Sequence, residues 1–273
     1  MALPADSLVH NFYRINADPA SKILNDNITT TACPLDNGKR RDRTSHDLAG
    51  LEKLAVELQH IILVQSDLQT LTDFRRVNRR AMEAVDNLPE YQSIVQHSPD
   101  SLRAILSTEL GKFITCQKLY DTLRTPSCEC CRQPTDLIYL LTCQRVCFKC
   151  LCWRIKFCPI TTEDAVRLYA VPSRLLAELP TMRSIPGYFG IRETAYTDRQ
   201  LMVDAWSAWL VASEHWAEHI AIQRAQHRFD TDISTALLPS ICYDPPMTVP
   251  FRWYPEPNRF MAVVRAPCIK NQE

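Results

Sequence analysis

The chain has 273 residues, of which 46% are hydrophobic and 23% are charged, the composition of an ordinary globular protein. Its 31 lysines and arginines balance its 31 aspartates and glutamates, so no net charge draws the whole chain to nucleic acid or to an anionic membrane. No apolar run approaches the roughly 20 residues of a membrane span, and the N-terminus lacks the features of a signal peptide. We therefore expect an intracellular protein of the cytoplasm or nucleus, without a membrane partner.

Residues 1–48 are largely polar and show no sustained periodicity, which predicts a disordered leader. The leader contains the basic run Lys39-Arg40-Arg41-Asp42-Arg43. Such a run is typical either of a solvated charge cluster or of a nuclear-import signal.

Residues 49–92 have the pattern of a helical hairpin. The segment from Leu54 to Val64 is mostly apolar, and Asp67 can cap a second helix with an apolar stripe from Leu68 to Leu88. Arginines lie beside or opposite this stripe, where they form either a solvated face or a set of phosphate contacts. These arginines are Arg75, Arg76, Arg79 and Arg80.

Short helices are expected on both sides of the cysteine-rich segment. In residues 93–127, Asp100 and Thr115 each precede an apolar helical pattern, and Pro89 fits the first turn of the helix before them. These residues are predicted to be linking helices.

Residues 159–273 are predicted to form a helical C-terminal region. Helices are expected to start near Thr161, Pro172 and Asp198. The region ends in a short strand-like run, Phe260–Val264, which we expect to pack near the cysteine-rich segment.

Eight of the twelve cysteines lie between residues 128 and 158. They include two C-x₂-C pairs, Cys128 with Cys131 and Cys147 with Cys150, separated by fifteen residues. This spacing is typical of a tetrahedral zinc site, and four thiolates leave no open coordination position. The segment 128–158 is therefore predicted to be a small β element held by one structural zinc ion.

Other ligand assignments remain open at this point. Cys130 competes with Cys131, and Cys143 could replace one of the later pair. The set Cys130, Cys143, Cys152 and Cys158 could even hold a second ion. Reduced core thiols or a redox pair would need no metal at all.

A second metal-binding pattern lies further along the chain. The residues His215-Trp216-Ala217-Glu218-His219 match H-x-x-E-H, an inverted zinc-peptidase motif. The pattern is short and no third ligand is evident, so the expected interpretation is a pair of polar helix residues around Trp216.

The segment from Leu54 to Val85 resembles an F-box, and longer strings are similar to F-box proteins of filamentous fungi. The similarity covers about residues 50–268, and the cysteine string is its most specific part. The strings are FRRVNRRA from Phe74, VDNLPEY from Val85, YLLTCQRVCFKCL from Tyr139, LPTMRSIPG from Leu179 and RFMAVVRAP from Arg259.

The resemblance implies a substrate receptor, because F-box helices dock on a Skp adaptor that joins a cullin ubiquitin ligase. An apolar strip on a helical hairpin suits such docking, although the same side chains could instead pack against the helices that follow. The F-box pattern begins with Leu-Pro, and Ala55 stands at the proline position, so docking is weakened if proline is needed to fix the backbone there. The docking residues implied here are Leu54, Glu57, Leu58, Ile61, Ile62 and Leu68.

We therefore predict a mainly α protein with an F-box-like helical hairpin, further helices and a small zinc-stabilised β element. The expected function is that of a non-enzymatic adaptor, which links an unknown protein substrate to a Skp–cullin ubiquitin ligase. The alternative is a zinc-stabilised module that binds nucleic acid or protein without a role in ubiquitination.

Overall fold

The computed structural model describes residues 24, 50–189, 194–227 and 262–269. Helices make up most of the regular structure in these residues, which confirms the mainly α prediction. Short 3₁₀ turns occur at η2 (Leu51–Lys53), η3 (Leu110–Phe113) and η4 (Ile155–Phe157). The α-helices are α3 (Val56–Gln65), α4 (Leu68–Arg75), α5 (Arg79–Asp86), α6 (Pro89–His97), α7 (Pro99–Ser107), α8 (Cys116–Arg124), α9 (Phe148–Trp153), α10 (Thr162–Tyr169), α11 (Ser173–Leu176) and α12 (Ala205–His227).

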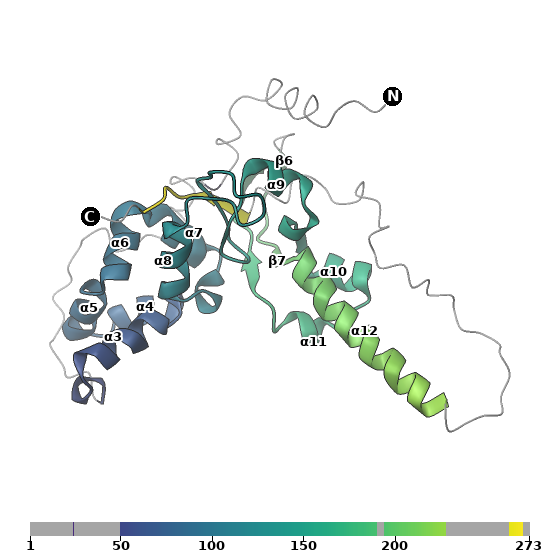
Figure 1. The fold of residues 1–273 in the computed structure, drawn as a ribbon, viewed down its shortest axis with the longest axis horizontal. Coiled ribbons are helices and arrows are strands. Elements are labelled where there is room, and N and C mark those ends of the chain that lie inside the picture. Colours follow the sequence, from purple (N-terminus) through teal and green to yellow (C-terminus); the bar gives the residue numbers. More distant parts are fainter. Residues whose placement is uncertain (1–23, 25–49, 190–193, 228–261, 270–273) are drawn as a thin grey trace, which may run out of the picture.

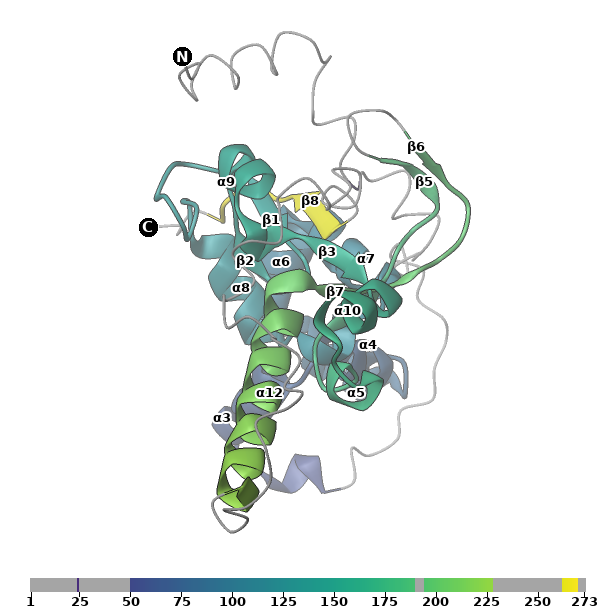
Figure 2. The ribbon, with the colours of Figure 1, turned by 90° about the vertical axis from the view of Figure 1, so that its right-hand side faces the viewer.

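Short strands form three small antiparallel sheets in the described part of the chain. The sheet orders are β2-β1-β8, β3-β7-β4 and β5-β6, and Figure 2 shows β5 and β6 as a ribbon extending away from the helices. The strands are β1 (Leu137–Tyr139), β2 (Gln144–Arg145), β3 (Pro159–Thr161), β4 (Thr181–Arg183), β5 (Gly187–Phe189), β6 (Thr194–Tyr196), β7 (Leu201–Asp204) and β8 (Val263–Arg265).

Several helices begin at the residues that the sequence singled out. The side chain of Asp67 accepts a hydrogen bond from the N–H of Thr70 at 2.8 Å, which caps α4. Thr115 and Thr161 cap α8 and α10 in the same way. Pro89 occupies the first turn of α6, where its missing N–H costs no hydrogen bond. Local side-chain chemistry therefore sets these boundaries.

The single helix expected from Leu68 to Leu88 is wrong, because the chain forms α4 and α5 instead. The side chain of Asn78 accepts a hydrogen bond from the N–H of Ala81 at 2.8 Å and starts α5. The break lets both Leu68 and Val85 become fully buried in one core. The Asn78 cap and the burial of both apolar residues therefore favour two short helices, although the apolar periodicity is continuous.

The helix expected to start at Asp198 is also wrong. Leu201–Asp204 form β7, which lies between β3 and β4 in the second sheet. The helical part begins only at Ala205, as α12. Met202 and Val203 are both fully buried, as expected for successive residues of a central strand that is covered on both faces. A short apolar run of this kind is compatible with a buried strand as well as with a helix.

Two hydrophobic cores divide the described residues. The larger core joins α3 to α8 with β1, β8 and the cysteine-rich segment. The smaller core lies among β3, β7 and the helices α10, α11 and α12. Figure 1 shows α3 to α8 on one side of the sheets and α10 to α12 on the other. The cysteine-rich segment thus shares its core with the front helices.

Leu24 belongs to the larger core, although it falls within the predicted disordered leader. Its side chain is buried, and its N–H donates to the carbonyl of Val263 at 3.2 Å. The leader prediction is therefore wrong at this residue. The rest of the leader, residues 1–23 and 25–48, lies outside the described residues.

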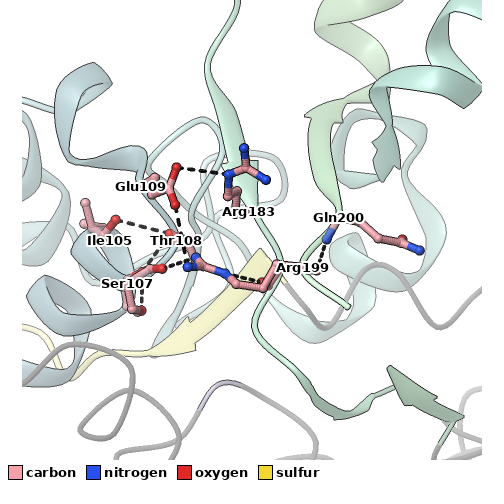
Figure 3. A network of polar contacts seen from close by, with 9 residues as sticks. Ile105, Ser107, Thr108, Glu109, Arg183, Arg199 and Gln200 are labelled. Carbon is pink, nitrogen blue, oxygen red and sulfur yellow. Dashed lines mark hydrogen bonds and ion pairs between the residues drawn. The ribbon is translucent and has the colours of Figure 1, made fainter. Parts of the chain in front are cut away.

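Glu109 links the front helices to the second sheet (Figure 3). Its carboxylate accepts a hydrogen bond from Nε of Arg183 at 3.2 Å and lies 3.6 Å from Nη1 of Arg199. Arg199 also donates to the carbonyls of Ser107 and Ser184. Exposed ion pairs contribute little individually. The junction also contains the hydrogen bond from the N–H of Arg183 to the carbonyl of Thr108 at 2.8 Å, and Met182 and Met202 of the second sheet are buried in the larger core.

A buried carboxyl forms a second link between the two cores. The hydroxyl of Tyr139 in β1 donates to Oδ1 of Asp204 in β7 at 2.8 Å. Ser207 donates both its N–H and its hydroxyl to Oδ2 at 2.9 and 2.8 Å. Asp204 is only 2% exposed, and burial raises the pKa of its carboxyl to about 6.

Asp204 predicts a pH dependence of stability. The folded protein holds this proton more tightly than the unfolded chain, in which the pKa of the carboxyl is 3.8. The stabilisation of the folded protein by the protonated Asp204 carboxyl is therefore full below about pH 4 and is lost as the pH rises through about 6. The difference of about 2 in pKa corresponds to about 3 kcal/mol.

Asp204→Asn is the matched variant, because its amide oxygen can accept from Ser207 and its NH₂ can donate to Tyr139. The unfolding free energy of the wild type, relative to this variant, should fall by about 3 kcal/mol between pH 4 and pH 7. Denaturant titrations at several pH values measure it. If the unfolding free energies of the two proteins changed with pH in the same way, Asp204 would not have a raised pKa in the folded protein.

Candidate metal centre and docking face

The first cysteine pair lies on a tight turn after α8. The N–H of Cys128 donates to the carbonyl of Gln133 at 2.8 Å, and the N–H of Arg132 donates to the carbonyl of Cys128 at 2.9 Å. Arg132 has a left-handed backbone conformation with a φ of 63°, which reverses the chain directly after Cys131. The turn therefore places both sulfur atoms on one side of the loop.

The second cysteine pair lies at the start of α9. Cys147 is the N-cap residue, and its sulfur accepts a hydrogen bond from the N–H of Cys150 at 3.4 Å. Residues at the N-cap and at the third helical position face the same side of the first turn, so Cys147 and Cys150 point together.

The hairpin of β1 and β2 brings the two pairs to one point. Ile138 pairs with Arg145, and the N–H of Glu129 in the first turn donates to the carbonyl of Arg145 at 3.0 Å. As a result, the Sγ atoms of all four cysteines lie within 4.8 Å of one another. The sulfur atoms of Cys131 and Cys147 lie 3.4 Å apart.

The arrangement has the dimensions of a tetrahedral thiolate site. A zinc–sulfur bond of about 2.3 Å gives sulfur–sulfur separations of about 3.8 Å, which the observed cluster brackets. Four soft thiolates suit zinc and leave no position for water or substrate. The residues therefore fit a closed, structural metal site.

The local electrostatics of the four thiols are uneven. The N–H of Gln133 and then the thiol of Cys147 lower the pKa of Cys131 to about 7. Burial raises the pKa values of Cys147 and Cys150. Four neighbouring thiolates would repel one another in this partly buried site, and a bound divalent cation would stabilise that charged form.

The other cysteines that competed as ligands lie elsewhere. Cys130 is exposed and does not belong to the cluster of four, and Cys143 is buried with its sulfur 3.7 Å from the hydroxyl of Thr122. Burial raises the pKa of Cys143 to about 11. Cys158 belongs to the smaller core, and the side chain of Cys152 lies outside the described residues. The described cysteines thus form one metal-binding group.

Arg145, between the two cysteine pairs, is a structural residue that the sequence analysis missed. Its guanidinium is fully buried and donates to carbonyl groups at the end of α8 and just after β8. The burial lowers its pKa. The accepting carbonyls are those of Thr122, Leu123, Ala266 and Pro267.

The docking residues implied by the F-box resemblance separate into two environments. Five of them are exposed on or just before α3, and the fractional exposures of Leu54, Leu58, Ile61 and Ile62 are 38%, 50%, 56% and 46%. Leu68 is fully buried in the larger core, so its side chain is not available to a partner, and that part of the prediction is wrong. The exposed residues of the set are Leu54, Glu57, Leu58, Ile61 and Ile62.

The exposed apolar strip lies on one face of α3. Ile61 and Ile62 lie three and four residues after Leu58, while Leu63 and Val64 are buried on the opposite side of the helix. Val56 in the first turn is 74% exposed. We call the exposed set Leu54, Val56, Leu58, Ile61 and Ile62 the α3 face.

The four arginines considered as phosphate contacts are all ion-paired within the chain. Arg75 binds Asp86 through two hydrogen bonds of 2.7 and 3.1 Å. The remaining three pair with Asp73, Glu83 and Glu52. These interactions leave the arginines poorly placed to neutralise phosphates.

The H-x-x-E-H motif lies on α12, but the side chains of Glu218 and His219 lie outside the described residues. His215 packs edge-on against Trp216 at a ring distance of 5.5 Å. Trp216 donates from Nε1 to the carbonyl of Tyr169 at 3.2 Å. These contacts describe a packed helix face.

No family model, curated protein or solved structure matches this chain. In the described residues, no helix is long and apolar enough to cross a membrane.

The cluster geometry predicts about one zinc ion per chain in protein purified without chelators. Cys147→Ser should lose this zinc, because it removes one of the four sulfur atoms, and the unfolding free energy should fall by several kcal/mol. Cys130→Ser is the matched control, since its sulfur lies outside the cluster, and it should keep the zinc. Elemental analysis and thermal unfolding measure both effects; equal zinc contents in the two variants would contradict the assignment.

Proposed function

We propose that this chain is a non-enzymatic adaptor that docks through the α3 face on a Skp-type adaptor protein of a cullin ubiquitin ligase. In this proposal a structural zinc ion holds the cysteine-rich segment, and another surface of the chain recruits a protein substrate. The observation that carries the proposal is the row of large apolar side chains left exposed on α3.

The exposure of the α3 face is the physical reason for a partner. Burying apolar surface contributes about 25 cal/mol per Å², so five large apolar side chains in water are a substantial source of binding free energy. A helix that leaves large apolar side chains exposed to solvent can dock in an apolar groove of a partner. The F-box resemblance supplies the identity of that groove, the Skp adaptor.

The backbone at Ala55 removes one objection to this docking. Ala55 has φ −58° and ψ 147°, and Leu54 before it is extended. These are the conformations that proline and the residue before proline adopt. The helix start therefore has the shape that a Leu-Pro pair would impose.

The alternative, a nucleic-acid-binding module, draws no support from the described surface. Its four candidate arginines each pair with an acidic side chain, and the chain has no net charge. Affinity for nucleic acid depends on cations that are free to replace counterions.

The docking proposal predicts the effect of a double substitution. The wild type should co-purify with a Skp adaptor, and Leu58→Asp with Ile61→Asp should weaken the affinity at least ~10-fold, since each places a carboxylate in an apolar interface. Both residues are half exposed or more, so the variant should fold normally. Affinity capture followed by titration calorimetry provides the measurement.

Val95→Asp is the matched control for that experiment, because Val95 is 40% exposed but lies on α6, outside the α3 face. It should bind the adaptor like the wild type. A folded, zinc-loaded wild type that captures no adaptor would overturn the docking proposal. An equal loss of adaptor affinity in the control and in the double variant would show that the added charge acts non-specifically.

Ala55→Pro tests the backbone argument separately. The substitution fits the observed dihedral angles, and the N–H of Ala55 donates to no other described residue, so stability should rise by about 0.5–1 kcal/mol. Affinity for the Skp adaptor should be unchanged or higher. A loss of stability in denaturant titrations would show that the helix start differs from the one described here.

A further inference from the structure

We infer that the metal centre is a redox-sensitive clamp, in which a hydroperoxide links Cys131 to Cys147 by a disulfide and releases the metal. The inference rests on the proposed zinc site. It assigns different roles to the four cysteines, which a site of purely structural thiolates would not require.

Access to the cluster is uneven. Cys131 is exposed, whereas Cys128, Cys147 and Cys150 are 0%, 9% and 4% exposed. A small oxidant in solvent therefore meets the sulfur of Cys131 first. Oxidation of cysteine follows thiolate character and exposure, and zinc binding keeps the sulfur in its thiolate form.

Cys147 is the proposed resolving thiol because its sulfur is in direct contact with that of Cys131. The sulfur of Cys147 lies 3.4 Å from that of Cys131. A disulfide bond is about 2.05 Å long, so the two sulfur atoms need to approach by little more than 1 Å. Cys131 lies on an exposed turn and Cys147 caps a helix, so the turn is the part that moves.

The chemistry balances with one hydroperoxide. The Cys131 thiolate attacks the outer oxygen of ROOH, the O–O bond breaks, and ROH leaves after taking one proton. The resulting sulfenic acid is attacked by the Cys147 thiolate, so the S–S bond forms, the S–O bond breaks, and hydroxide takes a second proton to leave as water. The two thiolates lose two electrons in total, and the hydroperoxide gains them.

The oxidised cluster can no longer hold the ion. Only Cys128 and Cys150 remain as ligands, and two thiolates do not complete a tetrahedral zinc site. Zinc then dissociates as Zn²⁺, and the first turn stays joined to the start of α9 through the disulfide. Thiol reductant and added zinc reverse the change.

The test uses the full chain, loaded with zinc and treated with hydrogen peroxide. A chromogenic zinc indicator follows the metal, and peptide mapping by mass spectrometry identifies the disulfide. We expect about one zinc released for each Cys131–Cys147 disulfide formed, and recovery with dithiothreitol and zinc. A different principal disulfide, or zinc retained while thiols are oxidised, would overturn the inference.

Two variants sharpen the assignment. Cys131→His keeps a zinc ligand but cannot form the disulfide, so it should release zinc at least ~10-fold more slowly than the wild type. Cys130→Ser removes the other exposed thiol of this turn and should release zinc at the wild-type rate. If Cys130→Ser released zinc slowly, Cys130 and not Cys131 would be the cysteine that the peroxide oxidises first.

Failure of the metal site and failure of the redox clamp give different experimental results. Wild-type protein that is folded but carries no zinc before oxidation rejects the metal site, and the inference with it. Protein that carries zinc but fails the disulfide mapping rejects the inference alone. If Cys131→His does not fold, mapping in the wild type and Cys130→Ser still decides the outcome.

Discussion

The crowding of four cysteine sulfurs within 4.8 Å is the constraint on which the rest of the structure depends. Burial opposes the charged form of Cys147 and Cys150, and four neighbouring thiolates would repel one another, so the proposed cation would stabilise the charged cluster. That cation would tie the turn after α8 to the start of α9 and close the β1–β2 hairpin between them. Around this hairpin the fully buried Arg145 joins the end of α8 to the segment after β8, more than a hundred residues away. The proposed metal site and the buried guanidinium would therefore stabilise the same region, around the β1–β2 hairpin.

This join explains how distant parts of the chain share one core. β8 pairs with β1, and the cysteine-rich segment packs with α3 to α8. Through Tyr139, the same strand β1 reaches the buried Asp204 at the start of α12. The α3 face lies outside this network, because Leu63 and Val64 hold the opposite side of α3 in the core. A folded core with the apolar α3 face left exposed is the physical basis of the adaptor proposal.

Much of this arrangement could be predicted from the sequence where local chemistry decides it. The spacing of the cysteine pairs identified the cluster, and Asp67, Thr115 and Thr161 marked helix starts. The errors arose where tertiary packing decides. The run Leu201–Asp204 fits a helix and a buried strand equally well, and only its neighbours β3 and β4 make it a strand. Arg145 gave no signal, because a charged residue in a sequence is expected at the surface and only the fold supplies the carbonyls that satisfy it.

X-ray absorption at the zinc edge, on full-length protein purified without chelators, tests the central claim most directly. It reports the metal, the type of its ligands and the bond lengths in one experiment. The account predicts a single shell of four sulfur atoms at about 2.3 Å. A shell containing nitrogen or oxygen, or a folded protein with no zinc signal, would contradict it.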